Sequence, residues 1–329
     1  MQKRIIPCLI ICALLLASCA QPQVSEDQPT PSSEDTEPTA SAPSAEDAAD
    51  IETGLSETDK ELYQQALALQ SYVDTLGFQN LRLIDYPVTV YLDGADYVMQ
   101  GDTLTKRQPP FFDHIHTTAR EVEDHYEVFV PPYEEWREIV KKGANVDFTP
   151  SRHINMIWHE AFHAYQLENY VKTTSEQFEF HHAEAEKTLD DSAYRSLFIT
   201  EQRLLDKAVS ADGTVDLTEL LNEWAVLIEQ YNDLLTDAQL EAVALYELVE
   251  GSAYYFESEI HRHLEGEKKY RKEYLAPFDE NHFDHTPTGR YYISGMKKLV
   301  LIERLNPNWK NGLTFSESVD SMLLKAMEG

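Results

Sequence analysis

Apolar residues recur at helical spacing near the start of the chain and then alternate as they do in strands. Residues 55–76 are predicted to form a helix, because apolar side chains return every three or four positions. These positions are Leu62, Ala66, Leu69 and Val73. Residues 88–92 and 95–99 alternate around Asp93-Gly94, which predicts a β-hairpin, and residues 125–130 are predicted as a further strand. The part from about residue 80 to about residue 130 is therefore expected to contain a small sheet.

Two helices are predicted after this sheet. The first covers residues 133–142 and ends at Gly143. The second begins at Thr149, a good N-cap residue, followed by Pro150, which suits the first helical position. One apolar stripe runs along the second helix at spacings of 4, 3 and 4: Ile154, Trp158, Ala161 and Tyr165. Because His159 and His163 lie on another face, one side of this helix is expected to pack while the other presents the histidines.

The second half of the chain has the pattern of successive helices. From residue 175 onward, helices are predicted at residues 192–209, 216–235, 237–264, 291–305 and 316–327. Thr236 and Gln239 form a capping box before the third of these helices, and Gly266 is a suitable stop after it. The predicted fold class is α+β and mostly α, with a larger helical part from about residue 133 to residue 329.

The first 19 residues are predicted to be a targeting segment. Lys3 and Arg4 precede a mostly apolar run over residues 5–16, which is short for a membrane span and typical of a signal peptide. The sequence Leu-Ala-Ser-Cys at residues 16–19 resembles a bacterial lipobox. This resemblance implies lipidation of Cys19 and an anchor on the extracytoplasmic face of the cell membrane, whereas a plain secretory signal is the alternative.

Composition separates a tether from a folded region. Residues 20–54 are acidic and rich in Ser, Pro and Thr, which predicts a disordered tether, and residues 55–329 are expected to form the folded domain. The net charge of −31 argues against nucleic acid as a partner, because phosphate binding needs clustered Lys and Arg. We expect a monomer. All three cysteines, Cys8, Cys12 and Cys19, lie in the targeting segment, so a metal site elsewhere must use His, Asp or Glu.

The sequence H-E-A-F-H at residues 159–163 contains the candidate metal-binding and catalytic residues. Two histidines four positions apart on a helix lie about one turn from each other, so both imidazoles can reach one metal ion. Glu160 lies beside them, where it can take a proton from a metal-bound water. This spacing predicts one catalytic Zn²⁺ per chain, with His159 and His163 as ligands and Glu160 as general base. The histidine that metzincins place further along is missing, because Gln166 and Asn169 stand where they have Gly and His.

A third protein ligand must come from elsewhere in the chain. Glu184 and Glu186 lie about 20 residues downstream, near the spacing of thermolysin-like enzymes. Glu250 lies in E-L-V-E-G-S-A-Y-Y-F-E, which resembles the E-G-x-A element of gluzincins, a class of zincin metallopeptidases with a glutamate ligand. The resemblance covers about residues 150–306 and implies a zincin-like fold with Glu250 as the ligand. A glycine at position 251 would suit a close approach of two helices at a shared metal.

Further residues are candidates for supporting roles. Glu247 or Glu257 could orient a ligand histidine through a hydrogen bond. Tyr292 matches a Y-x-x-G element that opens a late helix in similar bacterial zincin-like proteins, and the resemblance implies that it is catalytic, as a donor to the developing oxyanion. Other candidates for that donor remain open: Tyr254, Tyr255, Arg290 and Tyr291.

These observations predict a surface-anchored zinc metallopeptidase that hydrolyses peptides or proteins outside the membrane. The alternative is a binding or scaffold lipoprotein with a zincin fold and no turnover, although such a protein would not need the base Glu160. A solute-binding lipoprotein would explain the lipobox and the tether but not the H-E-x-x-H helix.

Overall fold

The computed structural model describes residues 54–144, 147–171, 175–211, 214–280, 288–311 and 313–328. The predicted leader, the lipidation residue Cys19 and the predicted tether up to residue 53 lie outside these residues. Within the described ranges, no helix has both the length and the apolar character that crossing a bilayer requires.

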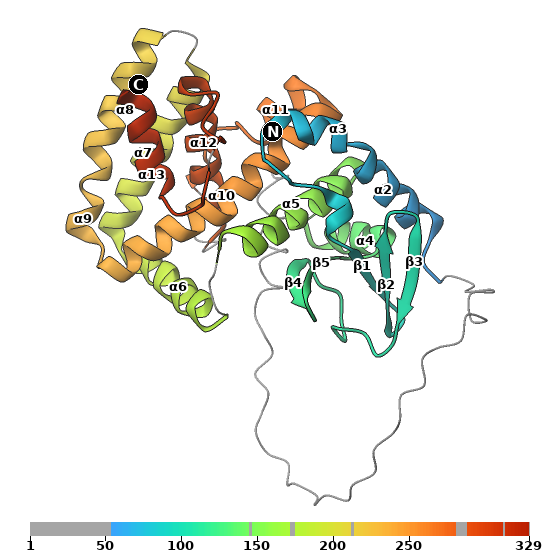
Figure 1. The fold of residues 1–329 in the computed structure, drawn as a ribbon. Helices are drawn as coiled ribbons and strands as arrows, with labels where there is room; N and C mark the ends of the chain where they lie inside the picture. Colours follow the sequence, from blue (N-terminus) through green and yellow to red (C-terminus); the bar gives the residue numbers. More distant parts are fainter. Residues whose placement is uncertain are drawn as a thin grey trace, which may run out of the picture.

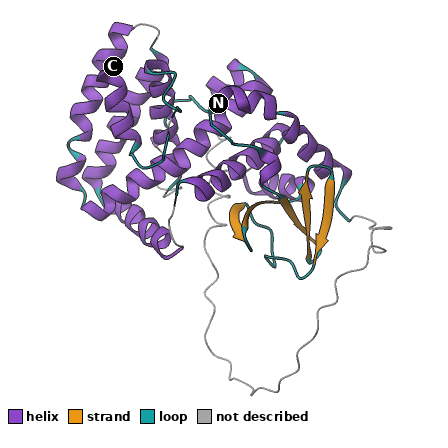
Figure 2. Ribbon diagram, viewed as in Figure 1, coloured by secondary structure: helices purple, strands orange, loops and turns teal. Residues whose placement is uncertain are grey.

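A mixed five-stranded sheet forms one side of the protein (Figures 1 and 2). Its strands are β1 (Val88–Leu92), β2 (Ala95–Gln100), β3 (Thr103–Arg107), β4 (Thr118–Val122) and β5 (His125–Val130). They lie in the order β3-β2-β1-β5-β4, with β1 and β5 parallel and the other neighbours antiparallel. Asp93 and Gly94 join β1 to β2 with φ angles of 51° and 75°, as a tight hairpin turn requires. β4 is therefore an edge strand.

Helices make up most of the described residues. They are α2 (Glu57–Ala68), α3 (Gln70–Val73), α4 (Tyr133–Ala144), α5 (Pro150–Asn169), α6 (Ser175–Lys187), α7 (Ser192–Ser210), α8 (Thr214–Ile228), α9 (Tyr231–Leu234), α10 (Asp237–Glu265), α11 (Glu267–Glu273), α12 (Gly289–Leu305) and α13 (Val319–Glu328). α5 packs against β4, β5 and α2, and α10 crosses between α5 and a group formed by α6, α12 and α13 (Figure 1). One cluster of buried apolar side chains extends from α2 to α13.

The α+β, mostly α class is confirmed, and several local predictions hold. β1 and β5 have the predicted bounds, and Thr236 with Gln239 forms both bonds of a capping box. Gly266 follows α10 with a φ of 84°, in the region that favours glycine.

Other local predictions were wrong. The helix expected over residues 216–235 is interrupted, since α8 ends at Ile228 and α9 begins at Tyr231. α4 continues through Gly143 to Ala144. The predicted start of α5 is correct, with Thr149 as the N-cap residue and Pro150 in the first turn. The Thr149 hydroxyl, however, pairs with Ser151 Oγ at 2.9 Å and does not cap the backbone.

α5 is covered on more sides than the apolar stripe predicts. Trp158 and Ala161 are buried as expected, and so are His159 and Glu160, on the face expected to be open. The sheet and α2 cover one side of α5, while α10 covers the side that carries the histidines. The histidines therefore lie between two helices, in contact with side chains of α10.

α10 and α12 approach each other through glycines. A Cβ on Gly251 would lie 2.7 Å from Gly295 Cα, and a Cβ on Gly295 would lie 2.4 Å from the carbonyl oxygen of Glu247. Both distances are far below van der Waals contact, so only glycine fits at this crossing. The close approach predicted at Gly251 is therefore present, but the partner helix is α12 and not the histidine helix α5.

Candidate metal centre

Three potential ligand atoms meet where α5 and α10 pack together. His159 and His163 come from successive turns of α5, and Glu250 comes from the middle of α10. His163 Nε2 lies 3.1 Å from His159 Nε2 and 3.1 Å from Glu250 Oε2, and His159 Nε2 lies 4.0 Å from the same oxygen. All three ligand atoms lie within 4.8 Å of one another, so this group could hold a metal ion.

The spacing of these atoms fits a small tetrahedral cation. Metal bonds of about 2.0–2.2 Å at tetrahedral angles place ligand atoms roughly 3.3–3.6 Å apart. The observed separations of 3.1, 3.1 and 4.0 Å bracket that range. The donor set of two imidazoles and one carboxylate is also that of a catalytic zinc site with one position left for water or substrate.

Gln166 orients the ring of His163. Its Oε1 lies 2.8 Å from His163 Nδ1, while its amide nitrogen donates to Val249 O at 3.0 Å and Ser252 Oγ at 2.9 Å. These two donations fix which end of the amide faces the histidine, so Nδ1 of His163 must donate to the oxygen. Nε2 then faces Glu250 and His159, where it can bind either a proton or a metal ion.

Glu257 orients the ring of His159 in the same way. Its Oε2 lies 2.9 Å from His159 Nδ1. Glu247, the other predicted candidate, does not take this role: its carboxylate accepts from Ser294 Oγ at 2.5 Å and from Lys298 Nζ at 2.7 Å. Glu247 lies on the face of α10 that packs against α12, whereas Glu257 lies two turns after Glu250 on the face toward α5.

The charges of this group favour a cation. Burial lowers the pKa of His163, but the Glu250 carboxylate, its contact with the ring, Glu160 and Gln166 raise it to about 9. For Glu250, burial raises the pKa, but His163, His159 and a hydrogen bond from Tyr292 bring it below the ordinary value. The site therefore attracts positive charge, either a proton or a metal ion.

Glu160 is a buried acid beside the two histidines. Only 6 % of the residue is exposed, and among the described residues no hydrogen bond or ion pair occupies its carboxylate. Burial raises its pKa, opposed by the charges of His159 and His163 and, more weakly, by that of Arg120. A carboxylate with a raised pKa and no internal partner is suited to hold a proton temporarily.

Among the tyrosines considered, Tyr292 is the one at the site. Its hydroxyl bonds to Glu250, and its ring stacks on that of His159 at 6.2 Å between centroids. Tyr291 instead bonds to Thr188 and Tyr194, both at 3.1 Å, in the core of the helical part. Two of the remaining candidates lie elsewhere: Arg290 donates to Ala185 O, and Tyr255 bonds to Glu303. The ring of Tyr254 contacts those of Tyr274 and Tyr292, so this tyrosine lies next to the site.

The alternative carboxylate ligands have partners on their own helix. Glu184 pairs with Lys187, and Glu186 lies 3.7 Å from His182 Nδ1. The structure thus brings Glu250, and neither Glu184 nor Glu186, to the two histidines.

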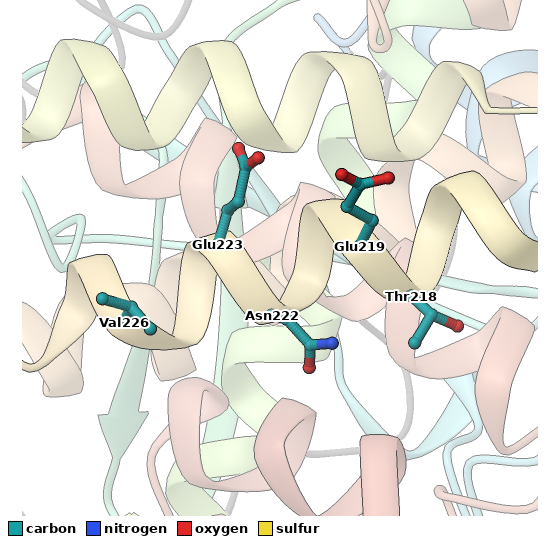
Figure 3. Close-up of a pocket in the computed structure, with 5 residues that line it drawn as sticks. All are labelled: Thr218, Glu219, Asn222, Glu223 and Val226. Atoms are coloured by element: carbon teal, nitrogen blue, oxygen red, sulfur yellow. The ribbon is translucent and has the colours of Figure 1, made fainter.

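A surface hollow lies on α8, which contributes none of the three ligand residues (Figure 3). It measures about 760 Å³ and is lined by Thr218, Glu219, Asn222, Glu223 and Val226. Figure 3 shows the two glutamates on one side of α8 and Thr218 and Asn222 on another. This hollow holds no group of converging ligand atoms.

Two supporting residues were not predicted from the sequence. Gln166 lies three positions after His163, so helical spacing could have indicated it. Tyr274, whose hydroxyl contacts Glu257, follows the separate helix α11, and no local pattern indicates that contact.

Comparison of the chain with protein-family models, with curated proteins and with solved structures gave no match. The function must therefore be argued from this geometry.

Proposed function

We propose that this chain is a zinc-dependent metallopeptidase with a zincin-like arrangement of α5, α10 and the sheet. One observation carries the proposal: His159 Nε2, His163 Nε2 and a Glu250 oxygen converge within 4.8 Å, beside the buried carboxylate of Glu160, which has no hydrogen-bond partner in the described part of the chain. A structural metal site does not need such an acid, whereas hydrolysis needs a base next to the cation.

Zinc is the cation that this donor set suits best. Two imidazoles and one carboxylate, each oriented by a neighbouring side chain, are common ligands of catalytic zinc. Harder cations such as Mg²⁺ and Ca²⁺ prefer shells made of oxygen. When bound, zinc supplies a Lewis acid that polarises a carbonyl and makes water acidic enough to lose a proton near neutral pH.

Side chains of the protein carry out the other steps of the proposed reaction. Glu160 accepts the proton of the attacking water and returns it to the leaving amine, which its raised pKa favours. Tyr292 places a hydroxyl at the site, and we assign to it the stabilisation of charge that develops on the carbonyl oxygen. Glu250, His159 and His163 hold the cation.

We propose the edge strand β4 as the binding site for an extended peptide. β4 packs against α5 and pairs with β5 on one side only, so its other edge can accept a further strand. Arg120 in the middle of β4 is exposed, and its charge acts on Glu160. A peptide paired with this edge would pass close to the general base.

The proposed setting follows from the N-terminal sequence. A lipid on Cys19 would hold a monomeric enzyme on the extracytoplasmic face of a bacterial membrane, where it would act on peptides or proteins. Nucleic acid is not proposed as a partner, given the net charge of −31.

Metal analysis and a single conservative substitution test the proposal. The purified protein should contain about one zinc per chain and should cleave members of a mixed peptide library. Glu160→Gln should retain the zinc and lose cleavage by at least about 100-fold, the scale of general base catalysis. Glu241→Gln, an exposed glutamate on α10, is the matched control and should cleave as the wild type does.

Two outcomes would change the conclusion. Zinc binding with equal inactivity of the wild type and the Glu160 variant across broad substrates would favour the scaffold function. Unchanged zinc content in His159→Ala would reject the metal centre itself.

A further inference from the structure

Tyr274 lies behind the metal centre, although it belongs to a separate part of the chain. It is the C-cap residue of α11, and its hydroxyl donates to Glu257 Oε1 at 2.5 Å. The other oxygen of Glu257 accepts from His159 Nδ1 at 2.9 Å. A chain of two hydrogen bonds therefore runs from Tyr274 through one carboxylate to a ligand histidine.

The geometry fixes the donors of both hydrogen bonds. A carboxylate oxygen accepts, and Glu257 has one oxygen 2.5 Å from the Tyr274 hydroxyl and the other 2.9 Å from His159 Nδ1. The Tyr274 O–H and the His159 Nδ1–H are therefore the donors. His159 then carries its proton on Nδ1, and the lone pair of Nε2 is free for a metal.

The ring of Tyr274 also contacts the other side of the site. Its centroid lies 5.0 Å from that of Tyr254, and the ring of Tyr254 meets that of Tyr292 edge-on at 6.1 Å. His261 packs against Tyr274 as well, at 5.0 Å. Tyr274 is only 6 % exposed, so these contacts hold it in one orientation.

We propose that Tyr274 is a positioning residue of the metal centre, which acts by fixing the Glu257 carboxylate against His159. A glutamate side chain has three rotatable bonds, and a hydrogen bond to one oxygen leaves the carboxylate free to rotate about the contact. The second hydrogen bond, from a rigid and buried phenol, removes that freedom. The inference rests on the proposed metal centre, but it concerns cation affinity and not peptide cleavage.

The first test measures zinc affinity by competition with a chromophoric chelator, using the whole protein. Partners that orient a ligand typically contribute 10–100-fold to metal affinity, so Glu257→Gln should lose about that much. Tyr274→Phe removes one oxygen and keeps the ring, and should lose about tenfold. Tyr270→Phe is the matched control: this tyrosine is buried in α11 and stacks on Tyr274, but its hydroxyl has no hydrogen-bond partner among the described residues. Its affinity should stay within about twofold of the wild type.

A double-mutant cycle distinguishes positioning from general loss of stability. If Tyr274 acts through Glu257, then Tyr274→Phe should change zinc affinity little in a protein that already carries Glu257→Gln. An equal tenfold loss in both backgrounds would overturn the proposal. So would a Tyr274→Phe protein that unfolds at lower urea yet binds zinc as tightly as the wild type.

Cobalt substitution gives an independent readout. The visible absorption bands of bound Co²⁺ report the ligand geometry, and they should change in Tyr274→Phe but not in Tyr270→Phe. If the wild type binds zinc without cleaving peptides, the proposed peptidase function is rejected, while the zinc affinities of the variants still decide whether Tyr274 is a positioning residue. If the wild type binds no zinc, the proposed function and the role of Tyr274 are both rejected.

Discussion

The glycine crossing of α10 and α12 permits a sharp test of how the helical part positions the site. In Gly295→Ala, the new methyl group would lie 2.4 Å from the carbonyl oxygen of Glu247 and 2.9 Å from Gly251 Cα. Ordinary contact begins at 3.4 Å, so the nearest distance falls about 1 Å short. Both neighbours are backbone atoms, which cannot rotate away, and α12 must move from α10 as a unit.

The expected cost combines two opposing effects. Overpacking a filled interface costs typically about 1–3 kcal/mol, and backbone contacts put this case at the upper end. Replacing a mid-helix glycine by alanine returns about 1 kcal/mol in helix propensity. We therefore expect the free energy of unfolding to fall by about 2 kcal/mol. Gly143→Ala in α4 is the control, because its methyl group meets no atom within 4 Å, and it should be neutral or stabilising.

The same substitution should separate metal binding from catalysis. His159, His163 and Glu250 lie on α5 and α10, so zinc affinity should change little, whereas Tyr292 lies on α12 and moves with it. A displacement of about 1 Å at a catalytic group can cost about 100-fold in rate. Urea unfolding and zinc titration of both alanine variants provide the measurements. A Gly295→Ala protein as stable as the wild type would show that the crossing is not tightly packed, and the reasoning would fail.

Four further predictions follow from the ligands and from the buried charges. Glu250→Gln should lower zinc affinity by more than about 100-fold, beyond the usual effect of replacing a residue that only orients a ligand. Glu241→Gln should leave the affinity unchanged in the same titration. Zinc affinity should rise with pH up to about 9, the pKa of His163, because the proton competes for Nε2. Without zinc, the raised pKa of His163 gives the free energy of unfolding the opposite pH dependence. The stabilisation is fully present below pH 6.5 and is lost as pH rises through about 9. Urea unfolding across that range would measure this loss. Lys298→Met should destabilise the protein by about 3–5 kcal/mol, because it leaves two buried carboxylates and the half-buried Asp320 without their cation. Zinc affinity should not change, and a parallel loss of zinc affinity would contradict a purely structural role. The distances from Lys298 Nζ are 2.9 Å to Glu201, 2.7 Å to Glu247 and 2.6 Å to Asp320.

The sequence pattern predicted a structural feature correctly where the residues that form it lie close together in the chain. The H-E-x-x-H spacing predicted that His159 and His163 share a helix face, and the structure brings their Nε2 atoms to 3.1 Å. The pairing with Glu250 came from a resemblance and from the glycine that follows it. The capping box at Thr236 is likewise a four-residue pattern.

Longer-range features were not predictable in this way. β3 was missed because none of its residues is fully buried, and β4 because its buried and exposed positions do not alternate. The partner of Gly251 was assigned to the wrong helix, because a glycine indicates close approach but not which backbone approaches. Tyr274 meets Glu257 only through the fold, since it comes after the turn at Gly266.

The meeting of α5 and α10 has a mechanical consequence for a chain whose cysteines all precede residue 20. His163 and Glu250 are 87 positions apart, so a cation between them would tie distant segments together as a disulfide does elsewhere, but reversibly. At a free zinc concentration 1,000 times the dissociation constant, this tie would add about 4 kcal/mol to the free energy of unfolding. Zinc supply would then govern how long the protein survives as well as what it can cleave.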